Sequence, residues 1–149
     1  MLFDLDGTLV DTAPDMVAVL QELQRAHDRE PVAYDVGRAY VSNGALGLLS
    51  LGFPDIEHAV GSELHAAYLE RYALRLCEAS ALFPGLEHLL EILDSAGLPW
   101  GVVTNKPQHL TDPLLDGLAL AGRSACTCLL YTSPSPRDAT SHLLCRLLL

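Results

Sequence analysis

The spacing of hydrophobic residues changes twice along the chain. A short apolar run predicts a buried strand over residues 1–5, because alternate side chains of a strand point to opposite faces. From residue 12 to residue 80 apolar residues recur at helical spacing, interrupted at Pro31 and at two turns. This stretch is expected to form helices over residues 12–28, 34–41, 45–51 and 56–78, with a turn at 42–44.

Two of these expected helices carry more specific signals. In the first, Thr12 is expected to cap the helix, and Asp15 to interact with the positive end of its dipole. Asp11 is interpreted in the same way, as a residue of the helix start. The last helix is expected to place one apolar stripe against its neighbours, formed by Leu64, Tyr68, Tyr72 and Leu76.

After residue 80 the pattern becomes that of alternating helices and strands. A helix is predicted over 86–96 and closed by Gly97, followed by an apolar strand over 99–104 and a helix over about 108–120. This order implies an α/β fold, a Rossmann-like parallel-sheet core with an inserted α-helical cap. The core would comprise residues 1–11 and 81–127, and the cap residues 12–80.

A pair of carboxylates follows the first predicted strand. Asp4 and Asp6 are two positions apart, so both point to one side of an extended chain while Leu5 points into the core. Gly7 then permits a sharp turn. Two like charges held side by side are unfavourable without a cation, so the pattern indicates a site for a metal and a phosphate. The alternative is a solvated acidic turn after an edge strand.

A second polar group of residues follows the strand over 99–104. Thr104 offers a hydroxyl, Asn105 an amide, and Lys106 is the only lysine of the chain. They stand at the carboxyl end of a parallel strand, where open α/β sheets bind ligands, and before a helix N-terminus, which attracts anions. The first strand would therefore end in a pair of carboxylates and the second in residues that bind phosphate. A polar strand-to-helix connector is the alternative.

Composition narrows the class of partner. The 149 residues carry a net charge of −10, which argues against binding to nucleic acid or a membrane surface but not against a small anionic substrate. The four cysteines and the histidines show no metal-ligand spacing. No signal peptide and no apolar run of about 20 residues is found, so we expect a cytoplasmic protein.

The end of the chain differs in composition from the rest. Only one of the 19 acidic residues, Asp138, lies in residues 128–149. Back-translation of residues 128–138 gives a nucleotide string that resembles the transposase adapter used in sequencing libraries. We expect residues 128–149 to be a non-native, adapter-like tail and the natural protein to continue beyond about residue 127. A low-complexity linker is the alternative.

Three motifs together resemble the haloacid dehalogenase superfamily: DLDGTLVDT at residues 4–12, LFPG at 82–85 and VTNKP at 103–107. The resemblance covers essentially all of residues 1–127. More narrowly, the chain is similar to the phosphoglycolate phosphatase group, and residues 69–125 are also similar to the N-acetylmuramic acid 6-phosphate phosphatases.

The resemblance implies a mechanism. Asp4 would be the nucleophile that forms an aspartyl-phosphate, and Asp6 the acid and then the base. Mg²⁺ would be held by the Asp4 carboxylate and the Asp6 main-chain carbonyl. Thr104 and amides near Gly7 and Asn105 would bind the phosphoryl oxygens, with Lys106 in a positioning role. Asn43 and Gly44, with Ser42 before them, form the cap loop expected to reach the substrate, and an ordinary connector between helices is the alternative.

The implied function is Mg²⁺-dependent hydrolysis of a small phosphomonoester, in carbohydrate metabolism. Phosphoglycolate is the first substrate hypothesis and N-acetylmuramic acid 6-phosphate the alternative. A sugar phosphomutase is a third hypothesis, and a dehalogenase is disfavoured because Asp6 is present. The family's later lysine and acidic motifs are absent, so the core is expected to be incomplete, and an inactive truncated fragment is a further alternative. Whether the protein is a monomer or a homodimer stays open.

Overall fold

The computed structural model describes residues 1–56, 58–131 and 142–147 and divides into two compact units. The α/β unit comprises Met1–Val10 and Leu82–Leu149, and the helical unit comprises Asp11–Ala81. The chain passes between them at two short strands that pair with each other, β2 (Val10–Asp11) and β3 (Ala81–Leu82). These two-residue strands were not expected, because they are too short to show a period.

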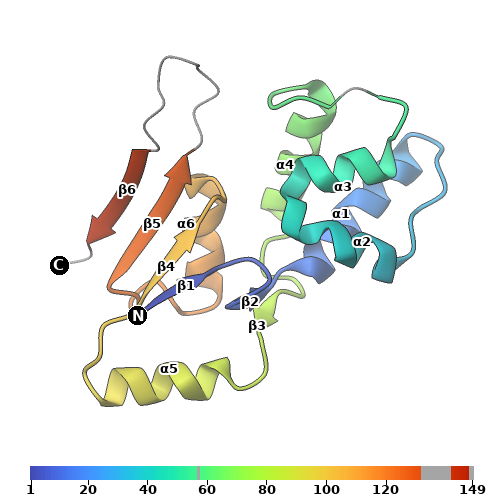
Figure 1. Ribbon diagram of the computed structural model, residues 1–149. Coiled ribbons are helices and arrows are strands. Elements are labelled where there is room, and N and C mark those ends of the chain that lie inside the picture. Colours follow the sequence, from blue (N-terminus) through green and yellow to red (C-terminus); the bar gives the residue numbers. More distant parts are fainter. Residues whose placement is uncertain (57, 132–141, 148–149) are drawn as a thin grey trace. The chain divides into compact units, whose positions relative to one another are not determined.

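The α/β unit is built on a sheet in the order β1-β4-β5-β6 (Figure 1). Its strands are β1 (Leu2–Asp4), β4 (Gly101–Thr104), β5 (Cys126–Tyr131) and β6 (His142–Leu147). β4 pairs with β1 and β5 in parallel, and β6 is antiparallel to β5. The predicted α/β class with a parallel sheet is thereby confirmed.

β5 and β6 fall where no strand was expected, because residues 128–149 are predicted to be a non-native tail. β5 supplies main-chain partners along the second edge of β4, which would otherwise be unpaired. Gly101 permits the close approach, because a Cβ at this position would lie 2.6 Å from the main-chain oxygen of Cys126. The parts of the expected adapter-like tail at 132–141 and 148–149 lie outside the described residues.

Two helices complete the α/β unit, α5 (Leu86–Ser95) and α6 (Gln108–Gly117). As predicted, α5 is followed by Gly97 with a positive φ of 63°. The buried indole of Trp100 packs edge-on against Phe3 and donates its Nε1–H to Asp94 at 2.8 Å. Arg123 donates to the same carboxylate, and the two donors together lower the pKa of Asp94. This cluster ties α5 to the start of β4.

The helical unit contains α1 (Ala13–Ala26), α2 (Tyr34–Tyr40), α3 (Gly44–Gly52) and α4 (Glu63–Leu74). α1 contacts the other three, because it carries a continuous apolar stripe that is fully buried. Tyr68 and Tyr72 of α4 are also buried, and the Tyr68 hydroxyl donates to the main-chain oxygen of Met16 at 2.9 Å. None of the described helices is both long and apolar enough to cross a membrane.

The helix predicted over 56–78 was wrong at both ends. The structure begins α4 only after Ser62, whose hydroxyl accepts from the amide of His65, and Gly61 before it has a positive φ of 84°. A residue in that conformation interrupts a right-handed helix. Leu76, expected on the stripe, lies beyond the last helical residue. Glu57 lies outside the described residues.

The start of α1 also differs from the prediction. Thr12 forms no side-chain cap, and its hydroxyl instead lies 3.6 Å from Sδ of Met16. The carboxylate of Asp11 accepts from the amide of Ala13 at 3.3 Å and forms an ion pair with Arg38. The turn expected at 42–44 is a 3₁₀ turn, Val41–Asn43, that leads directly into α3.

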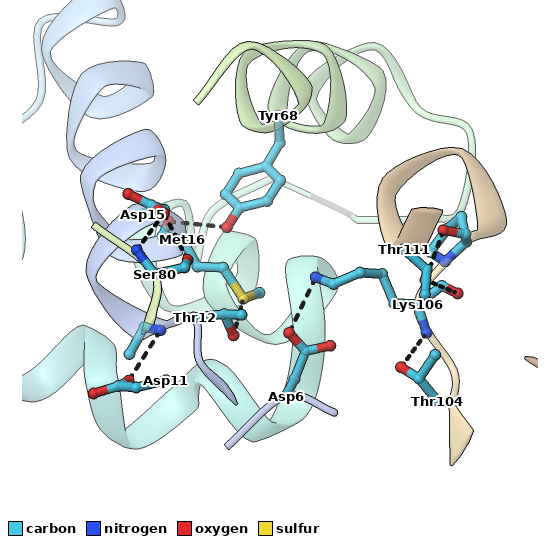
Figure 2. A network of polar contacts seen from close by, with 12 residues as sticks. Asp6, Asp11, Thr12, Asp15, Met16, Tyr68, Ser80, Thr104, Lys106 and Thr111 are labelled. Carbon is cyan, nitrogen blue, oxygen red and sulfur yellow. Dashed lines mark hydrogen bonds and ion pairs between the residues drawn. The ribbon is translucent and has the colours of Figure 1, made fainter. Parts of the chain in front are cut away.

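Asp15 is a buried charged residue of the helical unit. Its side chain is buried, and its two oxygens accept from the amide of Ala79 at 2.9 Å, the amide of Ser80 at 2.9 Å and the Ser80 hydroxyl at 2.6 Å. Figure 2 shows the contacts between Asp15 and Ser80. A buried carboxylate requires such donors. Asp15 therefore joins the first turn of α1 to the segment by which the chain leaves the unit, and is more than a helix-dipole residue.

Replacing Asp15 by alanine should lower the free energy of unfolding by about 3 kcal/mol, because buried donors lose a charged acceptor. Ser80→Ala, which removes one of the three bonds, should cost about 1 kcal/mol. Urea denaturation of both variants measures the difference. Equal stability of Asp15→Ala and the unaltered chain would show that the three hydrogen bonds of Asp15 contribute nothing to stability.

A second prediction concerns Asp55, which receives both terminal nitrogens of Arg29 at 2.5 and 2.6 Å. This pairing lowers the pKa of Asp55 from 3.8 to about 2. The stabilisation is therefore complete above pH 4 and is lost as the pH falls through about 2. Carbon NMR titration of the Asp55 carboxyl should show that midpoint, and Arg29→Gln should return it to near 3.8. An unchanged midpoint in Arg29→Gln would contradict the assignment.

Candidate active site

The turn after β1 presents its two carboxylates differently. Asp4 ends the strand and is exposed, while Leu5 is fully buried, as the alternation predicts. The amide of Leu9 donates to the Asp4 main-chain oxygen at 3.1 Å, and the amide of Gly7 donates to Val10 at 2.9 Å. These bonds close a tight loop, in which Gly7 has a φ of 80°.

The loop after β4 is held by two threonines. The Thr104 hydroxyl, nearly fully buried, accepts from the amide of Lys106 at 3.1 Å. The Thr111 hydroxyl lies 3.2 Å from the main-chain oxygen of Lys106 and 3.1 Å from that of Pro107, each an acceptor for its proton. Residue 106 is therefore fixed through both its amide and its carbonyl.

The two loops meet through one ion pair. Nζ of Lys106 lies 3.1 Å from Oδ1 of Asp6 (Figure 2). The Lys106 side chain is only 6% exposed and that of Asp6 19% exposed, so the pair is largely shielded from water. Parallel pairing places Asp4 opposite Val103, and both strands consequently end at the same edge of the sheet.

The structure brings some of the predicted site residues together. Lys106 contacts both Asp6, through the ion pair, and Thr104, through a hydrogen bond, and Asp4 and Gly7 lie on the same short turn as Asp6. Asn105 follows Thr104 and is exposed. The remaining two belong to the helical unit: Asn43 is exposed at the start of α3, and Gly44 has a φ of 66°. The roles of all these residues stay predictions.

Two hydroxyls near the site were missed by the sequence reasoning. Thr8 donates to Oδ2 of Asp4 at 3.4 Å, and Thr111 fixes the Lys106 loop. The sequence contains a signal for each of these two hydroxyls. Thr8 stands in a tight turn after a carboxylate, and Thr111 lies one turn into a helix that follows a proline, where a hydroxyl often bonds back to a main-chain oxygen.

The donor set fits magnesium in kind. Asp4 and Asp6 supply hard oxygen atoms, and magnesium is commonly held by one or two carboxylates while keeping several water ligands. Among residues 1–56, 58–131 and 142–147 there is no group of three or more His, Cys, Asp or Glu side chains that could hold a metal ion. The described residues would therefore supply only part of a coordination shell.

Comparison with known proteins gives a consistent result. A family model described as haloacid dehalogenase-like hydrolase matches residues 1–139. A phosphoglycolate phosphatase from Xylella fastidiosa is 38% identical over 125 residues, which are 84% of this chain and 55% of that protein. An N-acetylmuramic acid 6-phosphate phosphatase from Pseudomonas aeruginosa is 40% identical over 130 residues, covering 83% and 55%.

The fold is also similar to solved structures. A crystal structure titled "predicted phosphoglycolate phosphatase", from Haemophilus somnus, superposes with a TM-score of 0.70 at 22% identity, covering 90% of this chain and 63% of that one. At this identity the likeness concerns the fold. The chain thus spans a little over half the length of the curated relatives it matches.

Gly7 provides a test of the turn after β1. Its φ is positive and nothing lies within 4 Å of an added Cβ, so Gly7→Ala should destabilise the chain by backbone strain alone, by about 1–2 kcal/mol. Gly122→Ala is a matched control, because it also has open space but no positive φ, and should change stability by less than about 0.5 kcal/mol. Thermal unfolding compares them. Equal effects would contradict the strained turn.

Proposed function

Because the chain belongs to the haloacid dehalogenase-like hydrolase family, we propose that it carries the nucleophile and the phosphate-binding residues of a magnesium-dependent phosphomonoester hydrolase. The observation that carries this proposal is the pairing of Asp6 with Lys106 beside Thr104, at the end of the strand that presents Asp4. Carboxylates and a cation are thereby gathered at one edge of a parallel sheet, which is suited to a phosphate ester.

Asp4 is the proposed nucleophile, since it is the exposed carboxylate at the strand end. One of its oxygens attacks phosphorus, the bond from phosphorus to the ester oxygen breaks, and an aspartyl-phosphate forms. Asp6 gives its proton to the departing alkoxide, which leaves as an alcohol. Asp6 then takes a proton from water, whose oxygen attacks phosphorus, and phosphate leaves as the Asp4 carboxylate is restored.

The phosphoryl oxygens would be bound by the Thr104 hydroxyl and by main-chain amides near Gly7 and Asn105. These donors stand on backbone already fixed by hydrogen bonds, which reduces the cost of ordering them during the reaction. A magnesium ion, held by the Asp4 carboxylate and the Asp6 main-chain carbonyl, would offset the charge of the phosphate.

The substrate proposed is a small phosphorylated metabolite, with phosphoglycolate first. Relatives carrying two different substrate names match this chain at almost the same identity, which supports N-acetylmuramic acid 6-phosphate as the second candidate. The helical unit would act as a cap, with Asn43 and Gly44 reaching the leaving group. A cytoplasmic location and a role in carbohydrate metabolism belong to the same proposal.

A competing possibility is that these 149 residues turn over nothing by themselves. The chain covers 55% of the length of the Xylella fastidiosa relative, and the described residues contain no group of three or more His, Cys, Asp or Glu side chains that could hold a metal ion. The proposal for the chemistry and the proposal for this polypeptide are therefore tested separately.

The test measures magnesium-dependent hydrolysis of a generic phosphate ester and of the two candidate substrates. One sample is the 149-residue chain, and the other is a chimera in which the unmatched segment of the Xylella fastidiosa relative replaces residues 128–149. We expect the chimera to be active and to lose at least about a thousandfold in kcat with Asp4→Asn or Asp6→Asn. Removal of magnesium by a chelator should abolish the rate.

Asp116→Asn is the matched control, because it makes the same chemical change at an exposed position on α6 and should leave kcat unchanged. An inactive chimera, or activity that survives Asp4→Asn, would contradict the proposed chemistry. Activity of the 149-residue chain alone would contradict the fragment hypothesis.

A further inference from the structure

Lys106 occupies an unusual position for a lysine. It is the only lysine of the chain, and its side chain is 6% exposed although a lysine side chain ordinarily extends into water. A buried ammonium is unfavourable unless a negative charge lies next to it. Oδ1 of Asp6 lies 3.1 Å from the ammonium nitrogen. The position of Lys106 is therefore connected to Asp6.

The backbone leaves Lys106 little freedom. Its amide donates to Thr104 and its carbonyl oxygen accepts from Thr111. The residue that follows is Pro107, which restricts residue 106 to extended conformations. The Lys106 side chain thus extends from a fixed backbone, and its ammonium restrains the Asp6 carboxylate through the ion pair.

Asp6 lies outside the regular strand, in the turn that follows it. It lies two residues beyond the end of β1, forms an isolated bridge with Val10, and precedes Gly7 in the tight turn. An aspartate side chain has few rotamers, and a directional contact to one oxygen selects among them. Lys106 supplies such a contact from the neighbouring loop.

From this geometry we infer that Lys106 is a positioning residue, which holds the Asp6 carboxylate in the orientation that the proposed proton transfers require. This inference rests on the proposed function, and it assigns Lys106 to Asp6 in place of the phosphate. A lysine suits the task because its ammonium is compact and ends a flexible stem that can reach across two loops.

The first experiment measures the side-chain torsion of Asp6 in the 149-residue chain, by NMR couplings from its backbone nitrogen and carbonyl carbon to Cγ. We expect one rotamer in the unaltered chain, averaging over several rotamers in Lys106→Met, and one rotamer again in Lys106→Arg. Arg123→Met is the matched control, because it removes a cation that forms ion pairs with Glu87 and Asp94. A single unchanged rotamer in folded Lys106→Met would overturn the inference.

The second experiment uses the active chimera. Lys106→Met should lower kcat by about tenfold to a hundredfold, because misplacing a reacting group by about 1 Å has effects of that size. KM should stay within about twofold, and Lys106→Arg should recover most of the rate. A large rise in KM with unchanged kcat would show that Lys106 contacts the phosphate, which overturns the inference.

The two experiments separate the inference from the function on which it rests. If the chimera hydrolyses no phosphate ester, the proposed function fails, while the torsion measurement still decides whether Lys106 orients Asp6. If the chimera is active and the torsion of Asp6 does not respond to Lys106→Met, the function stands and the inference fails.

Discussion

The parallel pairing of β1 with β4 is the constraint on which the candidate site depends. Asp4 lies opposite Val103, so the loops after these two strands leave the sheet at one edge. Residues far apart in the sequence, Asp6 and Lys106, then form an ion pair. A shift of the register by a single residue would turn alternate side chains to the opposite face and separate the two groups. The proposed chemistry therefore depends on the register between β1 and β4, because this register brings the two loops together.

Both units follow the same rule for charge inside protein. In the helical unit the buried carboxylate of Asp15 is matched by donors from residues 79–80, and in the α/β unit the buried ammonium of Lys106 is matched by Asp6. In each case the partner comes from a distant part of the sequence, so the interaction joins two segments as well as neutralising a charge. Removing one member leaves the other without its compensation.

The sequence was sufficient where a pattern is local. The strands at β1 and β4 and the helices α1, α5 and α6 follow from apolar spacing and from punctuation by proline and glycine. The prediction over residues 56–62 failed because the positive φ of Gly61 outweighs helical spacing there. The partners of Asp15, the ion pair of Lys106 and the two-residue strands β2 and β3 could not be predicted, because each is decided by tertiary pairing.

Insertion of the helical unit between β1 and β4 also bears on how the chain is made. During synthesis β1 is complete long before its partner at Gly101–Thr104 exists, while Asp11–Ala81 forms a continuous stretch whose helices contact one another. All segments of the helical unit are therefore synthesised before β4, and the helical unit can fold while residues 1–10 still lack their partner strand. Closing that long loop carries an entropic cost, and the apolar strand is exposed to other chains until it is closed. A nascent chain that stalls before β4 would present this strand to the chaperones of the cell.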